Sequence, residues 1–258
     1  MDRPTRRVIL PMHMSRTLAA VCVSSYAMLA SSGTSIAAPS PSLVLRYTFN
    51  TDSTSAIADA STNAITGLLV NADPATAFTP GKTGKGKALQ LEAPERQYVA
   101  VPEDDALDVN SFTLSAWVRY TGAVTPETRG RWEVLEKAGA YWLNIRTDGH
   151  VRTGAFFGGC DDSRYWKYLD STATVPPNTW THVAATYNGV KLTIYIGGVR
   201  SGSLPVQGST CVNNEPLAIG AKNAPSKGIL EAFWDGQLDE VRIYSRALGA
   251  SGIARLAR

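Results

Sequence analysis

The chain has 258 residues, a length that suits one large domain or two small ones. Hydrophobic residues make up 44% and charged residues 18%, which is apolar enough for a packed core and excludes an intrinsically disordered chain. The formal net charge of +3 comes from residues 1–37, which hold four arginines and one acid, and the remaining residues have equal numbers of bases and acids. The basic balance therefore gives no support for a nucleic-acid partner.

The N-terminus has the pattern of a secretory signal peptide. Arginines precede an apolar stretch from Leu18 to Leu29, and small residues follow that stretch. Ser35 and Ala37 fit the small-x-small cleavage pattern, so we predict that residues 1–37 are removed. Residues 42–258 contain no Pro/Ser-rich linker and no internal repeat, which predicts that residues 38–258 form one secreted domain, extracellular or periplasmic. The apolar stretch is too short and too rich in serine to span a bilayer.

Two cysteines remain once Cys22 leaves with the signal peptide. In an oxidising compartment, Cys160 and Cys211 are expected to form one disulfide. Such a bridge closes a long loop and stabilises the fold by about 4 kcal/mol in the chain-entropy model. Two free buried thiols are the alternative.

Alternation of apolar and polar residues dominates the rest of the sequence. In Phe112–Tyr120, the clearest example, Phe112, Leu114, Ala116 and Val118 fall on one face. The dipeptides Asp148-Gly149 and Asn188-Gly189 predict hairpin turns. Predicted strands are Leu43–Phe49, Ala88–Leu91, Tyr98–Val101, Phe112–Tyr120, Ala140–Thr147, Val151–Phe157, Thr181–Tyr187, Lys191–Ile196, Leu217–Gly220 and Gln237–Tyr244, with one helical tail, Ala250–Ala257. Many short strands and almost no helix predict an all-β sandwich of two antiparallel sheets.

Several short blocks, in order along the chain, carry a family resemblance. They are Tyr47–Phe49 with Asp59–Asn63 and Gly67, Gly86–Leu91 with Tyr98–Pro102, Phe112–Val118, Trp180–Ala184, Leu192–Gly198 and Asp235–Leu248. From about Leu43 to Leu256 the chain resembles the laminin-G-like, concanavalin A-like jelly-roll family of secreted bacterial proteins. The resemblance implies a jelly-roll sandwich, and it leaves function open because such domains bind, scaffold or accompany enzymes.

Some members of this family hold a structural calcium ion. The resemblance places the corresponding ligands at Asp59, Asn63, Gly67 and Asp239, with Thr62 replacing a glycine of the family pattern. Calcium binds six to eight hard oxygens, which these side chains and a backbone carbonyl of Gly67 would help to supply. Alternation with Val241 and Ile243 places Asp239 on the inward side of its strand. The alternative is that the acidic residues only cap turns and backbone N–H groups.

Aromatic and arginine side chains on the polar faces of the strands indicate a ligand surface. Aromatic rings stack on the apolar faces of sugars, and arginine pairs with carboxylates or sulfates. The candidate ligand-binding residues are Arg119, Trp142, Arg146, Arg152, Tyr165 and Trp166. We therefore predict a non-catalytic module for an extracellular polysaccharide, with acidic sugars preferred. A protein-interaction or adhesion domain is the alternative, and any of these side chains can instead pack as cross-strand pairs.

Catalytic interpretations have weaker support, and the sequence leaves open whether the chain is an enzyme. Lys137–Tyr141 resembles a motif of alginate-type polysaccharide lyases, but the Gln-Ile-His element of those enzymes is missing. A glycosidase needs two carboxylates that face one groove, and by strict alternation Glu133 and Glu136 point to opposite faces. His182 has no second histidine at a metal-ligand spacing, which favours a structural role.

Overall fold

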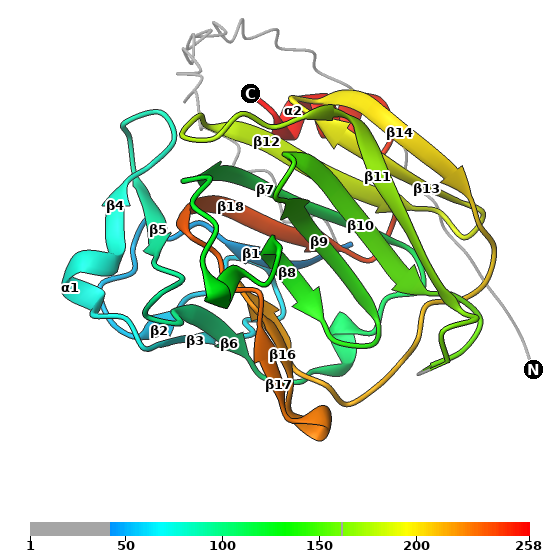
Figure 1. The fold of residues 1–258 in the computed structure, drawn as a ribbon, viewed down its shortest axis with the longest axis horizontal. Helices are drawn as coiled ribbons and strands as arrows, with labels where there is room; N and C mark the ends of the chain where they lie inside the picture. Colours follow the sequence, from blue (N-terminus) through cyan, green and yellow to red (C-terminus); the bar gives the residue numbers. More distant parts are fainter. Residues whose placement is uncertain (1–41, 161) are drawn as a thin grey trace, which may run out of the picture. The chain divides into compact units, whose positions relative to one another are not determined.

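The alternating segments pair into two antiparallel sheets that pack face to face (Figure 1). This computed structural model describes residues 42–160 and 162–258, so the predicted signal peptide lies outside the described residues. The predicted all-β jelly-roll sandwich is confirmed.

Sheet A has eight strands in the order β14-β13-β12-β7-β18-β5-β4, and β1 also pairs with β18. Its strands are β1 (Leu43–Tyr47), β4 (Phe78–Pro80), β5 (Lys87–Leu91), β7 (Phe112–Tyr120), β12 (Thr181–Tyr187), β13 (Lys191–Ile196), β14 (Val199–Pro205) and β18 (Gly236–Tyr244).

Sheet B also has eight strands, in the order β11-β10-β9-β8-β15-β6-β3-β2. They are β2 (Ala56–Ile57), β3 (Gly67–Val70), β6 (Tyr98–Val101), β8 (Arg131–Lys137), β9 (Tyr141–Arg146), β10 (His150–Phe156), β11 (Trp166–Thr174) and β15 (Leu217–Ile219). A separate hairpin of β16 (Lys222–Ala224) and β17 (Ile229–Glu231) lies beside β8 (Figure 1).

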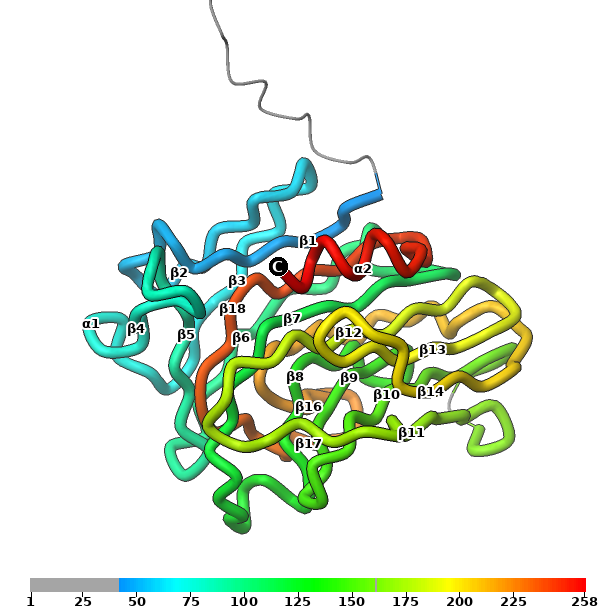
Figure 2. Tube along the Cα trace, turned by 90° about the horizontal axis from the view of Figure 1, so that it is seen from above, coloured from blue at the N-terminus to red at the C-terminus, as the bar shows by residue number. Residues whose placement is uncertain are grey.

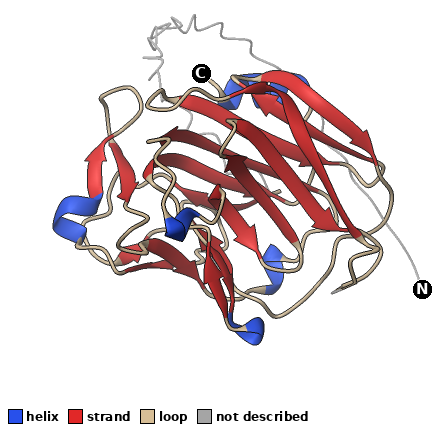
Figure 3. Cartoon of the chain, viewed as in Figure 1, coloured by secondary structure: helices blue, strands red, loops and turns tan. Residues whose placement is uncertain are grey.

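In the part of the chain that the structure describes, helices are few and short (Figure 3). They are α1 (Pro74–Ala77), α2 (Ala250–Leu256) and the 3-10 turns η1 (Asp105–Leu107), η2 (Pro126–Thr128) and η3 (Pro225–Lys227). Figure 2 shows α2, in red, outside the strands of sheet A, where Ile253 packs against Ala184 and Tyr195. Among the described residues, no helix has the length and hydropathy needed to cross a membrane.

The core lies between the two sheets, as the alternation in β7 predicts. Phe112, Leu114, Ala116 and Val118 are fully buried and belong to one large hydrophobic cluster. That cluster also takes alternate residues of β9 from sheet B, namely Tyr141, Leu143 and Ile145. The residues between them, Trp142 and Asn144, therefore face away from the core.

Bulges in two strands overturn predictions that relied on strict alternation. In β8, Glu133 pairs with Asn144 and Leu135 with Leu143, so that Val134 is an extra residue. Glu133 and Glu136 consequently lie on the same outer face of sheet B, and the prediction that they are out of phase is wrong.

The second bulge lies in β18. Between the pairs Asp239–Trp117 and Arg242–Ser115, β18 has one more residue than β7, and Glu240 has a positive φ of 51°. Leu238 occupies the core instead of Asp239. The inward placement predicted for Asp239 is therefore wrong, because the bulge reverses the alternation.

Candidate functional site

A groove of about 610 Å³ lies on the outer face of sheet B. Its floor comes from β8, β9, β10 and β11, and the β16–β17 hairpin and residues 213–216 form its walls. In Figure 1 the hairpin, in orange, stands beside β8. Three predicted ligand residues line this groove, namely Trp142, Arg152 and Trp166.

Aromatic rings form one side of the groove. The ring centroids of Trp142 and Trp166 are 5.9 Å apart, and those of Trp142 and Phe156 are 6.5 Å apart. Gly154 on β10 makes this arrangement possible, because a Cβ at that position would overlap the Trp142 ring. Trp166 is 47% exposed although it lies in a strand, so its indole ring is available to a ligand.

Two acidic residues of β8 lie on the outer face of sheet B, and one of them, Glu136, lines the groove. Glu133 is fully buried, bonds to Arg131 at 3.0 Å and accepts hydrogen bonds from the amide of Asn144. Glu136 is 6% exposed and lines the groove directly. Burial raises the pKa of Glu133 to about 7, and burial, helped by the charge of Glu133, raises the pKa of Glu136 to about 8. Sequence reasoning missed this pair because the bulge is not visible in the pattern.

The arginines beside the groove are already paired. Asp170 on β11 accepts hydrogen bonds from Arg152 at 2.7 and 2.8 Å and from Arg146 at 3.0 Å. Arg146 also pairs with Asp148 at 3.0 Å. Hydrogen bonding to Arg152 lowers the pKa of Asp170. With Asp148 included, the set consists of two arginines and two aspartates.

Other predicted ligand residues lie elsewhere. Arg119 belongs to β7 of sheet A, where it donates hydrogen bonds to the carbonyl of Asn178 and the side chain of Gln237. Tyr165 lies in the loop that carries Cys160, with its ring close to Gly159. The predicted set is thus divided among the groove, its border, the loop that precedes Trp166 and sheet A.

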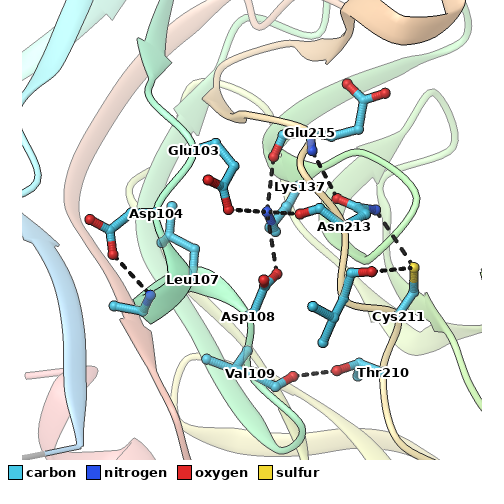
Figure 4. A network of polar contacts seen from close by, with 12 residues as sticks. Glu103, Asp104, Leu107, Asp108, Val109, Lys137, Thr210, Cys211, Asn213 and Glu215 are labelled. Carbon is cyan, nitrogen blue, oxygen red and sulfur yellow. Dashed lines mark hydrogen bonds and ion pairs between the residues drawn. The ribbon is translucent and has the colours of Figure 1, made fainter.

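The wall formed by residues 213–216 is held from behind by Lys137 and a disulfide. Cys160 and Cys211 are bonded, with Cα atoms 5.1 Å apart, as predicted. The side chain of Lys137 is fully buried, and its Nζ atom donates hydrogen bonds to the carbonyl oxygens of Asn213 at 2.8 Å and Glu215 at 2.9 Å (Figure 4). The same ammonium lies 3.3 Å from Asp108.

One acidic cluster among the described residues has the spacing of a metal site, namely Glu103, Asp105 and Asp108. The Lys137 ammonium lies 3.8 Å from Glu103 and 3.3 Å from Asp108, so it already supplies positive charge to two of the three carboxylates (Figure 4). A divalent cation would be repelled by this charge.

The residues predicted to bind calcium have protein partners. The carboxylate of Asp59 accepts four hydrogen bonds, from the N–H groups of Arg46, Ser61 and Ile65 and from the Ser61 hydroxyl. Asn63 donates its amide to the carbonyl of Val44. These contacts match the turn-capping alternative, and the calcium site stays a prediction.

The other two predicted calcium ligands, Asp239 and Gly67, have different surroundings from Asp59 and Asn63. Asp239 accepts a hydrogen bond from the N–H of Lys82 and lines a second pocket of about 290 Å³ with Trp117 and Arg242. Gly67 lies against Tyr47 and Val99, where a Cβ would clash with the Val99 side chain. Its small size is therefore explained by packing.

Tyr141 of the lyase-like motif and His182 are both buried. Tyr141 is fully buried and its hydroxyl donates to the carbonyl of Leu107, while burial raises its pKa above the ordinary value. His182 is buried against Ser115, with 2.9 Å between its Nε2 atom and the Ser115 Oγ atom. Burial lowers the pKa of His182 to about 3, which keeps the ring neutral and supports its structural role.

Several solved structures have folds similar to that of this chain. Domain 4 of AbnA, a GH43 extracellular arabinanase from Geobacillus stearothermophilus, solved with arabinotriose, aligns with a TM-score of 0.61 and 22% identity over 84% of this chain and 98% of that chain. The binding domain of Paraclostridial Mosquitocidal Protein 1 aligns with a TM-score of 0.61 and 20% identity, covering 84% of this chain and 52% of that one. The binding domain of botulinum neurotoxin DC in complex with SialylT aligns with a TM-score of 0.60 and 14% identity, covering 84% and 51%.

The chain thus spans about half the length of the two toxin domains and nearly all of the arabinanase domain. A comparison with curated protein sequences finds no match. The family model described as the concanavalin A-like lectin/glucanases superfamily matches residues 94–254, which is more than half of the chain. The chain belongs to the concanavalin A-like lectin/glucanases superfamily, of the laminin-G-like type predicted from its sequence.

Proposed function

We propose that this protein is a carbohydrate-binding module that holds a polysaccharide chain in the groove on sheet B. The observation that carries the proposal is the aromatic side of that groove, where Trp142, Phe156 and an exposed Trp166 stand within contact distance of one another. Sugar rings present apolar C–H faces that pack on such rings, and the neighbouring polar groups fix their orientation. The likeness to an arabinanase domain solved with arabinotriose supports the same ligand class.

The ligand that best suits the groove is uncharged. The predicted preference for acidic sugars depended on Arg146 and Arg152 being free of local acids, and Asp170 pairs with both. A uronate or sulfate would have to displace Asp170 to reach these guanidinium groups. A neutral polysaccharide needs no such exchange.

We propose that the protein acts outside the cytoplasm, after removal of residues 1–37. The Cys160–Cys211 disulfide supports this location, because disulfides persist in oxidising compartments. An extracellular polysaccharide is the ligand that such a location makes accessible.

Binding of the purified protein to a glycan array, followed by titration of the glycans that bind, tests the proposed function. Trp166→Ala removes an exposed ring and should weaken binding about tenfold or more without unfolding the protein. A loss of affinity of this size is expected when one aromatic stacking contact is removed. Val199→Ala, at a 70% exposed position on β14 of sheet A, is the control. Equal binding by the wild type and Trp166→Ala would contradict the assignment of the groove.

Hydrolysis of a glycosidic bond is a second candidate, favoured by one observation. The bulge at Val134 places two carboxyl groups with raised pKa on one face, as glycosidases require. Glu133, however, is fully buried and ion-paired with Arg131, so only Glu136 faces the groove. Binding without cleavage is therefore favoured, and an assay for new reducing ends on the bound polysaccharide separates the two functions.

A further inference from the structure

Glu136 differs from the other charged side chains that line the groove. Arg131 pairs with Glu133 and Glu231, Arg152 with Asp170, and Lys222 with Glu231. Glu215 accepts a hydrogen bond from Ser226, and Lys227 has a partner as well. Within residues 42–160 and 162–258, the carboxyl group of Glu136 alone in this set has neither a hydrogen bond nor an ion pair.

Burial makes this lack of a partner significant. Glu136 is 6% exposed and lines the groove, so its carboxyl group keeps only a little contact with water and has no protein hydrogen bond to replace the rest, which is unfavourable. Buried polar groups in folded proteins are almost always satisfied. A group that is buried, unpaired and directed into an open groove is suited to hydrogen bond to a ligand.

The position of Glu136 in the sheet defines what it would contact. On β8, Glu136 is the direct cross-strand neighbour of Trp142 on β9. The groove therefore presents an aromatic face and one carboxyl group side by side. A sugar has the complementary arrangement, since its ring has an apolar face and hydroxyl groups at its edge.

Charges from every neighbouring element are balanced around Glu136. Arg131 and Lys222 lower its pKa, whereas Glu133 and Glu231 raise it. Arg152 on β10 and Glu215 in the wall lie further along the lining, each with its own partner. With the neighbouring charges opposed, burial dominates, and the carboxyl group is largely protonated at neutral pH.

We propose that Glu136 selects and orients the ligand by hydrogen bonding, as a neutral carboxylic acid, to a hydroxyl or ring oxygen of an uncharged sugar that packs on Trp142. This inference rests on the proposed function and adds the ligand class and the selecting residue. A ligand that covers the groove removes the remaining water from Glu136, which costs little for the neutral acid and much for its ionised form.

Titration of arabinotriose into the wild type, Glu136→Gln and Glu136→Ala at pH 6 and pH 9 tests the proposal. Titration of the wild type with trigalacturonate and with its uncharged methyl ester compares a charged and an uncharged ligand of the same size. Glu136→Gln keeps the shape and the hydrogen-bonding capacity of the neutral acid, so its binding should match that of the wild type at pH 6 and be unchanged at pH 9. The wild type should weaken about tenfold from pH 6 to pH 9, and Glu136→Ala should bind about tenfold more weakly than the wild type at pH 6. The methyl ester should bind more tightly than trigalacturonate.

The outcomes distinguish failure of the role proposed for Glu136 from failure of the proposed carbohydrate binding. If Trp166→Ala loses binding while Glu136→Ala binds as the wild type does, the groove is the sugar site and the role given to Glu136 is overturned. Tighter wild-type binding at pH 9, or a preference for trigalacturonate over its ester, overturns the neutral-acid contact. If no glycan binds to the wild type, either on the array or among these probes, the proposed function fails and this inference fails with it. Thermal melts of each variant exclude unfolding as the cause of a loss.

Discussion

Lys137 and Asp108 form an ion pair behind the groove wall, with 3.3 Å between the Nζ and Oδ1 atoms and the lysine side chain fully buried. The ammonium group also donates hydrogen bonds to two carbonyl oxygens of residues 213–216 (Figure 4). A single buried charge thus connects the η1 loop, strand β8 and the wall of the candidate site.

Removal of this charge should destabilise the protein. Lys137→Met leaves Asp108 and two carbonyl groups without their cation, and the expected cost is about 3 kcal/mol, because breaking a buried pair leaves an uncompensated charge. Denaturation in urea measures the change. Lys191→Met, at an exposed position on β13, is the control and should stay within about 0.5 kcal/mol of the wild type. Equal losses in the two variants would show that the ammonium has no structural role.

Reduction of the disulfide should lower the stability and loosen the same wall. Cys160 and Cys211 are 51 residues apart, for which the chain-entropy model gives about 4 kcal/mol. In a domain of this size, such a loss corresponds to a fall in Tm of about 8–16 °C. Calorimetry with and without a reductant, with thiols counted in parallel, measures it. A Tm that is unchanged when two thiols are titrated would contradict the prediction.

Asp170→Asn should convert the border of the groove into a site for acidic sugars. The substitution removes the carboxylate that pairs with Arg146 and Arg152, so the guanidinium group of Arg152 loses its ion-pair partner and Arg146 keeps only Asp148. Affinity electrophoresis in gels that contain polygalacturonate should show about fivefold tighter binding than for the wild type at low salt. Salt at about 0.3 M should abolish the gain, because exposed charges are screened. Identical mobility of the two proteins would mean that Asp170 does not shield the arginines.

His182 should make the folded state less stable in acid. Burial lowers its pKa from 6.5 to about 3, so the unfolded chain binds a proton over this range and the folded chain does not. Its contribution to stability is therefore complete above pH 6.5 and is lost as the pH falls toward 3, with a slope of up to about 1.4 kcal/mol per pH unit. In urea unfolding between pH 3 and pH 7, His182→Gln should show a flatter dependence than the wild type. Parallel curves would refute the assignment.

The fold was predictable where alternation is regular. Strands β6, β7, β12 and β13 begin and end at the predicted residues, and in β7, β12 and β13 polar residues alternate with core residues and mark the period. Strand β8 was missed because it is buried on both faces and has a bulge at Val134, so its period is interrupted. The hairpin of β16 and β17 has only three residues in each strand, which is too short for a pattern.

The candidate site was predictable only in part, for a physical reason. The outward phases of Trp142 and Arg152 follow from their own strands, and both residues line the groove. The pairing of Arg152 with Asp170 depends on a third strand, β11, whose alternation is weak. The position of Glu136 in the groove could not be predicted without the bulge in β8 and the location of the β16–β17 hairpin. Contacts between strands distant in sequence are not encoded in the period of any one strand.

The central claim is that a sugar binds in the groove on sheet B, and the indole N–H signals of the six tryptophans test it most directly. Single Trp→Phe substitutions assign these signals in proton–nitrogen correlation spectra, and a glycan that binds on the array is then added. The account predicts that the signals of Trp142 and Trp166 shift, while that of Trp117, which lines the pocket on the other sheet, does not. A shift of Trp117 with no change at Trp142 and Trp166 would contradict the account and place the ligand on sheet A.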